Sequence, residues 1–173
     1  MMNKTVRKSP RLLLLAVFGV LLFTSISCGG APMQTTQSAE QAQQSVLNFV
    51  HAAAAASFPA GYKLTELPLQ PMPCTDNFDH ETGQVSVGIT YWVDGPDRAH
   101  NNDYYGKLVK WWSDNGWSVR ADTWLNKHFV NASSKEGYLM SLTATTTGNV
   151  LGRLSIGVSS PCVWPHGTPE AKS

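Results

Sequence analysis

Two short clusters of ionisable side chains contain the residue types that chemistry requires. The first is Asp76, Asp79, His80 and Glu81, which place carboxylates and an imidazole within six residues and could hold a divalent cation. This cluster has neither the spacing nor the glycine placement of an EF-hand loop, so the sequence favours a solvated acidic loop. We therefore expect no metal ion and no other cofactor in this protein.

The second cluster is the pair His100 and Asp103, which lie three residues apart and could act as a general acid and base. Polar residues near the start of a predicted helix are more often caps. The serine between Gly152 and Gly157 lacks the G-x-S-x-G spacing of a nucleophile elbow. No catalytic motif emerges, and we predict that the protein is not an enzyme.

Cys28 is the residue whose surroundings indicate a specific reaction. It follows a basic segment (residues 4–11) and an apolar run of 15 residues (12–26). That run is too short for a membrane span of about 20 residues but suits a secretory signal. A cysteine directly after the small Ser27 is what a bacterial lipoprotein signal requires, because the thiol accepts a diacylglycerol before cleavage. The stretch resembles the lipobox, which favours leucine where this chain has Ser25.

The signal sets the expected domain organisation. We predict a signal peptide over residues 1–27, a small and polar lipid-anchored tether over 28–37, and a single α+β domain over 38–173. Four of the 13 basic residues lie in the signal, so the rest of the chain carries 9 basic against 12 acidic residues, a formal charge of −3. We therefore expect no nucleic-acid partner. Because the end of the signal also fits ordinary secretory cleavage, a secreted protein without lipid is an alternative.

The cysteine count supports the lipid. Three cysteines in an exported protein leave one unpaired, and a free thiol is a liability in an oxidising compartment. If Cys28 carries lipid, Cys74 and Cys162 remain as one pair, and we predict a disulfide between them. Such a bond closes a loop of about 89 residues, for which chain entropy gives on the order of 4 to 5 kcal/mol. A nucleophilic Cys74 or Cys162 is the alternative, but neither has a histidine and base in any known local pattern.

Apolar periodicity predicts the elements of the domain. Ser38 begins a capping-box pattern before a helix over about 39–56, and a second helix ends at Gly116. Prolines in 62–79 permit edge pairing but not a central strand. Period-two strands are predicted over 85–93, 117–123, 137–146 and 153–160. We predict an α+β two-layer sandwich, a mainly antiparallel four-stranded sheet with two helices on one face, in the order α-β-β-α-β-β-β.

The strand faces opposite the predicted core consist mainly of small hydroxyl and glycine side chains, nearly free of lysine and glutamate. The members of this set are Ser86, Gly88, Thr90, Trp92, Ser118, Arg120, Asp122, Ser141, Thr143, Thr145, Arg153, Ser155, Gly157 and Ser159. An open face of this kind suits docking of a partner protein, a glycan or a second copy, and we predict a binding surface anchored by Trp92 and Arg120 that includes Thr90 and Thr143. The alternative is an ordinary solvated sheet face, where Ser and Thr are common.

Four features together carry a resemblance to a known family. They are Cys28, the cysteine motif at 73–76, the helix end at 114–117 and the strand end at 160–162. The layout resembles the small, mostly uncharacterised Lpp-type lipoproteins of mycobacteria and related actinobacteria, over most of the mature chain. The resemblance implies a lipid anchor on the extracytoplasmic face of the cell membrane. It implies no activity, cofactor or catalytic residues.

These observations lead to one expected function and two alternatives. We expect a lipid-anchored lipoprotein of the cell envelope whose domain is a non-enzymatic binding or interaction module. Its expected partners are the membrane, through the anchor, and an envelope protein or glycan. The alternatives are an envelope hydrolase or transferase that uses groups near His80 and His100, and a secreted protein without lipid. A pocket that gathers titratable groups would support the hydrolase or transferase, and their dispersal on loops would support the binding module.

Overall fold

The computed structural model describes residues 37–169. The predicted signal peptide, Cys28 and the tether up to residue 36 lie outside the described residues. The elements follow one another as α1 (Ala39–Ser57), β1 (Lys63–Leu67), β2 (Met72–Thr75), β3 (Glu81–Ser86), β4 (Gly88–Asp94), the 3-10 helix η1 (Arg98–His100), α2 (Asn101–Asp114), β5 (Ser118–Asp122), α3 (Trp124–Lys127), β6 (Phe129–Ser133), β7 (Leu139–Ala144), the 3-10 helix η2 (Gly148–Val150) and β8 (Leu154–Ser159).

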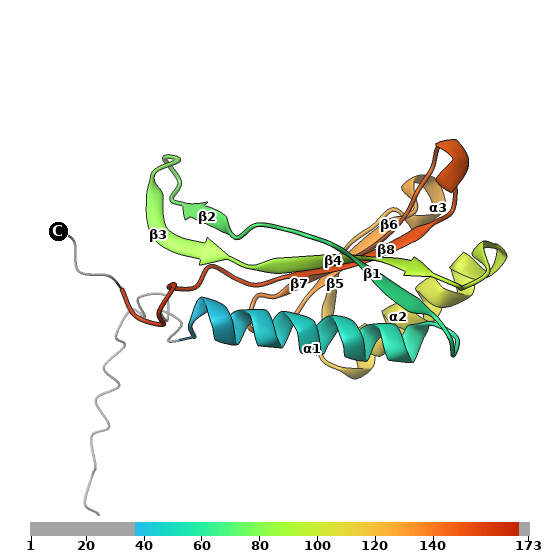
Figure 1. Ribbon diagram of the computed structural model, residues 1–173, viewed down its shortest axis with the longest axis horizontal. Coiled ribbons are helices and arrows are strands. Elements are labelled where there is room, and N and C mark those ends of the chain that lie inside the picture. Colours follow the sequence, from blue (N-terminus) through green and yellow to red (C-terminus); the bar gives the residue numbers. More distant parts are fainter. Residues whose placement is uncertain (1–36, 170–173) are drawn as a thin grey trace, which may run out of the picture. The chain divides into compact units, whose positions relative to one another are not determined.

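Six strands form one antiparallel sheet in the spatial order β1-β4-β8-β7-β6-β5, while β2 and β3 pair separately. The long helices α1 and α2 lie on the same face of the large sheet (Figure 1). The α+β class with a mainly antiparallel sheet is therefore confirmed. The predicted four-stranded sheet and the order α-β-β-α-β-β-β are wrong.

The additional strands explain this correction. β6 (FVNAS) is too short to show a period of its own, since it buries only Val130 and Ala132. The predicted strand over 85–93 is interrupted, because β3 ends at Ser86 and β4 begins at Gly88. β1 pairs with β4 at the edge of the sheet, where the prolines that follow it are tolerated.

The core lies between the two long helices and the sheet. Ser38 accepts a hydrogen bond from the backbone N–H of Gln41 and completes the predicted capping box at the start of α1. α2 buries residues at a spacing of four, and its Trp112 Nε1 donates to the sulfur of Met140 on β7 at 3.1 Å. The buried strand positions alternate as expected for one covered face. They are Ile89, Tyr91, Val93, Val130, Ala132, Met140, Leu142, Ala144, Leu154, Ile156 and Val158.

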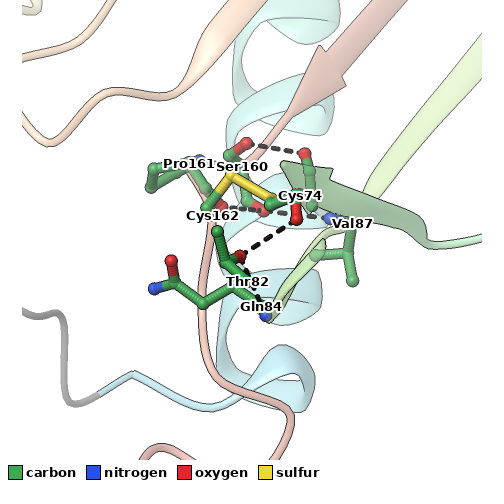
Figure 2. Close-up of a disulfide and its surroundings, with 8 residues drawn as sticks. Cys74, Thr82, Gln84, Val87, Ser160, Pro161 and Cys162 are labelled. Atoms are coloured by element: carbon green, nitrogen blue, oxygen red, sulfur yellow. Dashed lines mark hydrogen bonds between the residues drawn. A yellow bond between two sulfur atoms is a disulfide. The ribbon is translucent and has the colours of Figure 1, made fainter. Parts of the chain in front are cut away.

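The β2–β3 hairpin is fastened to the end of β8 by a junction of hydrogen bonds and one disulfide (Figure 2). The backbone N–H of Val87 donates to Ser160 Oγ at 3.0 Å, and the N–H of Ser160 donates to the carbonyl of Val87 at 2.8 Å. Pro161 has no N–H to continue this ladder. If the register of β4 and β8 continued, Val85 would pair with Cys162. Instead it pairs with Val163, one residue further on, through two backbone hydrogen bonds of 2.9 Å. This one-residue mismatch coincides with the break between β3 and β4.

The structure joins Cys74 and Cys162 by a disulfide with a Cα–Cα distance of 6.1 Å and a sequence separation of 88 residues. Cys74 lies on β2 and Cys162 follows β8 (Figure 2), so the bond joins two segments that both pair with β3. Apart from Cys74, the residues of β2 are exposed. The crosslink therefore holds a strand that contributes only one side chain to the interior.

We expect the double substitution Cys74→Ala and Cys162→Ala to lower the free energy of unfolding by roughly 2 to 5 kcal/mol, because the unfolded chain loses its crosslink. Urea unfolding followed by tryptophan fluorescence would measure the change. Thr75→Ala, an exposed change on the same strand, is the control and should alter stability by less than about 0.5 kcal/mol. An unchanged urea midpoint in the double variant would contradict this stabilising role.

Candidate functional site

The ionisable pairs singled out in the sequence lie on separate elements. His80 Nδ1 is 3.4 Å from Asp76 Oδ2 in the turn between β2 and β3, and both side chains are exposed. His100 Nδ1 is 3.0 Å from Asp103 Oδ2 at the start of α2, also in solvent. The full lengths of β3 and β4 separate the two pairs along the chain. Within residues 37–169, no three His, Cys, Asp or Glu side chains are placed to hold a metal ion.

Asp76 has an evident structural role in the acidic turn. Its Oδ1 accepts hydrogen bonds from the backbone N–H of Phe78 at 2.8 Å and of His80 at 3.1 Å. These bonds favour the ionised carboxylate, so the pKa of Asp76 lies below its ordinary value of 3.8. The carboxylate that seemed available to a cation thus closes the hairpin turn.

The face of the large sheet opposite α1 and α2 gathers most of the predicted binding surface, and we call it the outer face (Figure 1). Strand register aligns its side chains in two rows across β4, β8, β7 and β6. The rows are Trp92, Ser155, Thr143 and Phe129, and beside them Thr90, Gly157, Ser141 and Asn131. Three of the predicted residues, Thr90, Trp92 and Thr143, therefore share one surface.

Trp92 is held at one side of this face by charged and polar neighbours. The guanidinium of Arg153 lies over its ring, 4.6 Å from the centroid. The same guanidinium donates two hydrogen bonds of 3.1 Å to the carboxylate of Asp94, which also accepts from Thr65 Oγ1 at 2.8 Å. The Thr65 bond, followed by the hydrogen bond and charge of Arg153, holds the pKa of Asp94 below its ordinary value. Arg153 thus holds the ring of Trp92 and balances the charge of Asp94.

Arg120 does not lie beside Trp92. It stands at a register shift in β5, between Val119 and Ala121, and three strands separate β5 from β4. The shift places Ala121 opposite Asn131, so the predicted alternation of strand 117–123 is wrong beyond that point.

Asp122, beyond the same register shift, was expected on the outer face. Instead its carboxylate accepts a hydrogen bond from the hydroxyl of Tyr105 on α2. This bond raises the pKa of Tyr105 to about 12. The cation that accompanies Trp92 is therefore Arg153, directly before β8, which the sequence placed on this face without a specific role.

A hollow of about 250 Å³ opens on the outer face where β4, β8, β7 and β6 meet the chain after β1. Its floor depends on Gly157, since a Cβ there would lie 2.7 Å from Thr90 Oγ1 and 3.3 Å from the carbonyl of Ile89. The hollow is lined by Leu69, Thr90, Phe129, Asn131, Leu139, Met140, Ser141, Gly157, Val158 and Ser159. Leu69, Phe129 and Asn131 were not among the predicted site residues, because only strand pairing brings them to this place.

The edges of the sheet are poorly suited to pairing with another chain. β1 exposes Lys63 and Glu66 and is followed by Pro68. β5 has five residues and carries the register shift at Arg120. Charge, proline and bulges at an edge discourage addition of a further strand. The outer face is therefore a better candidate for binding than either edge.

No protein family, curated protein or solved structure matches this chain. None of the helices in residues 37–169 is long and apolar enough to cross a membrane. The resemblance to actinobacterial lipoproteins stays a prediction from the sequence.

We expect Asp94→Asn to lower the free energy of unfolding near neutral pH, because the bonds to Thr65 and Arg153 are strongest with the carboxylate. The folded-state pKa is depressed, so this stabilisation is present above the ordinary pKa of 3.8 and is lost as the pH falls through the folded value. Urea unfolding from about pH 7 to about pH 2.5 should show the variant and the wild type converging at acid pH. Asp79→Asn, in the exposed turn, is the control, and a gap that stays constant with pH would contradict this role for Asp94.

Proposed function

We propose that this protein is a lipid-anchored lipoprotein of the cell envelope, held by Cys28 on the extracytoplasmic face of the cell membrane. Its domain is a non-enzymatic binding module that uses the outer face to bind an envelope protein or glycan. In this proposal it belongs with the small Lpp-type lipoproteins of actinobacteria that its sequence resembles.

The cysteines support the anchor. The disulfide uses Cys74 and Cys162, so Cys28 is the one cysteine of the three that it leaves out. Disulfides form and persist in oxidising compartments, which fits a domain outside the cytoplasm. Cys28 follows a signal-like segment, where a lipoprotein signal needs a cysteine.

The observation that carries the binding role is the composition of the outer face. Its two rows offer hydroxyl, amide, glycine and aromatic groups, and the adjacent charges of Arg153 and Asp94 neutralise each other. Exposed sheet faces are ordinarily kept soluble by lysine and glutamate. The two rows carry neither residue, and Lys63 lies at the edge of the face, on β1 opposite Asp94. A surface of this composition, with a hollow on it, has the character of a recognition surface.

We expect membrane-extracted protein to carry a diacylglycerol on Cys28, since the signal and the cysteine count both require it. Intact-mass analysis would detect the added mass. Cys28→Ser should move the protein from the membrane to the soluble fraction, because stable retention needs at least two acyl chains. An unmodified Cys28 amino terminus in the culture fluid would show instead that the protein is secreted.

We expect Thr90→Lys with Thr143→Lys to abolish binding to isolated cell envelope while the domain stays folded. Both side chains are half-buried on the outer face, where lysine introduces charge and bulk. Co-sedimentation would be measured in the Cys28→Ser background, so that the lipid does not mask the result. Gln44→Lys with Asn48→Lys, which adds the same charge to exposed positions of α1, is the control. Binding that survives the double change on the outer face would exclude that face as the binding surface.

A further inference from the structure

We infer that the hollow on the outer face binds an uncharged oligosaccharide. This inference rests on the proposed binding function and names the ligand of the same surface. It is drawn from three properties of the lining: its lack of charge, its free hydrogen-bonding groups and its apolar walls.

The lining carries no charged side chain. The ten residues around the hollow include no Asp, Glu, Lys, Arg or His. On the same face, the charges of Asp94 and Arg153 are paired with each other through two hydrogen bonds. An ionised ligand would lose solvation here without gaining a counter-charge. The absence of charged side chains in the lining therefore favours a neutral ligand.

The polar groups of the hollow are available to a ligand. Within residues 37–169, no hydrogen bond joins the hydroxyls of Thr90, Ser141 or Ser159 to another residue. The only buried polar side-chain atoms without a partner in these residues are Ser57 Oγ and Trp164 Nε1. The hydroxyl oxygens of Thr90, Ser141 and Ser159 are therefore accessible to solvent. A hydroxyl both donates and accepts. These three groups suit a ligand that also carries many hydroxyls.

Asn131 adds a directed donor. Its Oδ1 accepts a hydrogen bond from the backbone N–H of Ala121 at 2.9 Å, which fixes the orientation of the amide. The Nδ2 group is left as the donor. A sugar ring presents hydroxyl oxygens that can accept such a bond.

The apolar walls complete the match to a sugar. Phe129 and Leu139 line the hollow from opposite ends of the β6–β7 pair, since Phe129 lies opposite Thr143 and Leu139 opposite Ser133. Leu69, which is 53% exposed, lines it from the chain after β1. A pyranose ring has a C–H face that packs on an aromatic ring and a rim of hydroxyls that hydrogen-bonds around it. The face extends for six residues of β8, or about 20 Å, and for three strand spacings from β4 to β6, or about 14 Å. These dimensions suit a chain of several sugars.

A protein partner fits this surface less well. An extended peptide is bound through its backbone at a sheet edge, whereas the backbone groups of β4, β8, β7 and β6 are already paired within the sheet. Face-to-face packing with a second copy requires apolar side chains that interdigitate across about 10 Å. Hydroxyls and glycine on the floor would leave such an interface short of apolar contact.

The test is titration calorimetry of the purified mature protein with neutral oligosaccharides and with uronic-acid oligosaccharides of the same length. We expect binding of neutral sugars and at least about tenfold weaker binding of the acidic ones. Asn131→Asp keeps the acceptor for Ala121 but removes the donor and adds charge, and Phe129→Leu keeps apolar volume but removes the ring. Each should weaken binding by at least about tenfold. Asn48→Asp and Phe78→Ala, at exposed positions of α1 and the hairpin turn, are the matched controls.

The outcomes separate this inference from the proposed function. The double variant Thr90→Lys with Thr143→Lys can lose envelope binding while no neutral oligosaccharide binds the wild type. In that case the outer face is still the binding surface, and the oligosaccharide inference is wrong. If sugars bind but Asn131→Asp and Phe129→Leu bind as well as the wild type, the hollow is not their site. Equal binding of neutral and acidic sugars would also overturn the inference. Urea midpoints of all variants establish that each is folded.

Discussion

Burial of one face of the six-stranded sheet against α1 and α2 is the interaction on which the other features depend. Val46 and Val50 of α1 are fully buried, as are Leu142 and Ile156 of the sheet. Each such side chain contributes about 1.5 to 3 kcal/mol relative to an exposed one. Both long helices pack on this face, so neither covers the opposite face of the sheet. That face must be compatible with water, and across β4, β8, β7 and β6 hydroxyls serve this purpose in place of lysine and glutamate.

The β2–β3 hairpin cannot rely on the same core. It exposes Met72 and Phe78, at 65% and 80% of their surface, and a two-stranded hairpin alone is marginal in water. Val85 of the hairpin packs against a small separate cluster that contains Ala42 of α1, and the residues that follow β8 hold the hairpin in place. These supply the pairing of Val163 with Val85 and the disulfide of Cys162 with Cys74. The same junction sets where β4 begins, and so the register of the strand that carries Thr90 and Trp92.

The sequence predicts well those features that depend on neighbouring residues. The capping box at Ser38 and the helix end at Gly116 are local, and both are confirmed. β6 was missed because five residues with two buried positions are too short to show a period. Strand order depends on long-range pairing that periodicity does not encode. A single register shift inverted the expected faces of β5 beyond Arg120, because side chains alternate with a period of two. The contacts of Arg153 and Asn131 likewise exist only once distant strands are adjacent.

The shallow shape of the site and the proposed anchor fit together. At about 250 Å³ the hollow is smaller than the roughly 300 to 1,000 Å³ typical of tight small-molecule sites. A free protein with such a site would bind weakly. In the proposed anchored form, a stretch of about ten residues could span at most roughly 35 Å, which would keep the domain within the layer that holds its proposed ligand. Confinement of this kind raises the effective concentration into the millimolar range for short flexible links. A weak, rapidly exchanging contact is then sufficient for association, and a deep pocket is not required.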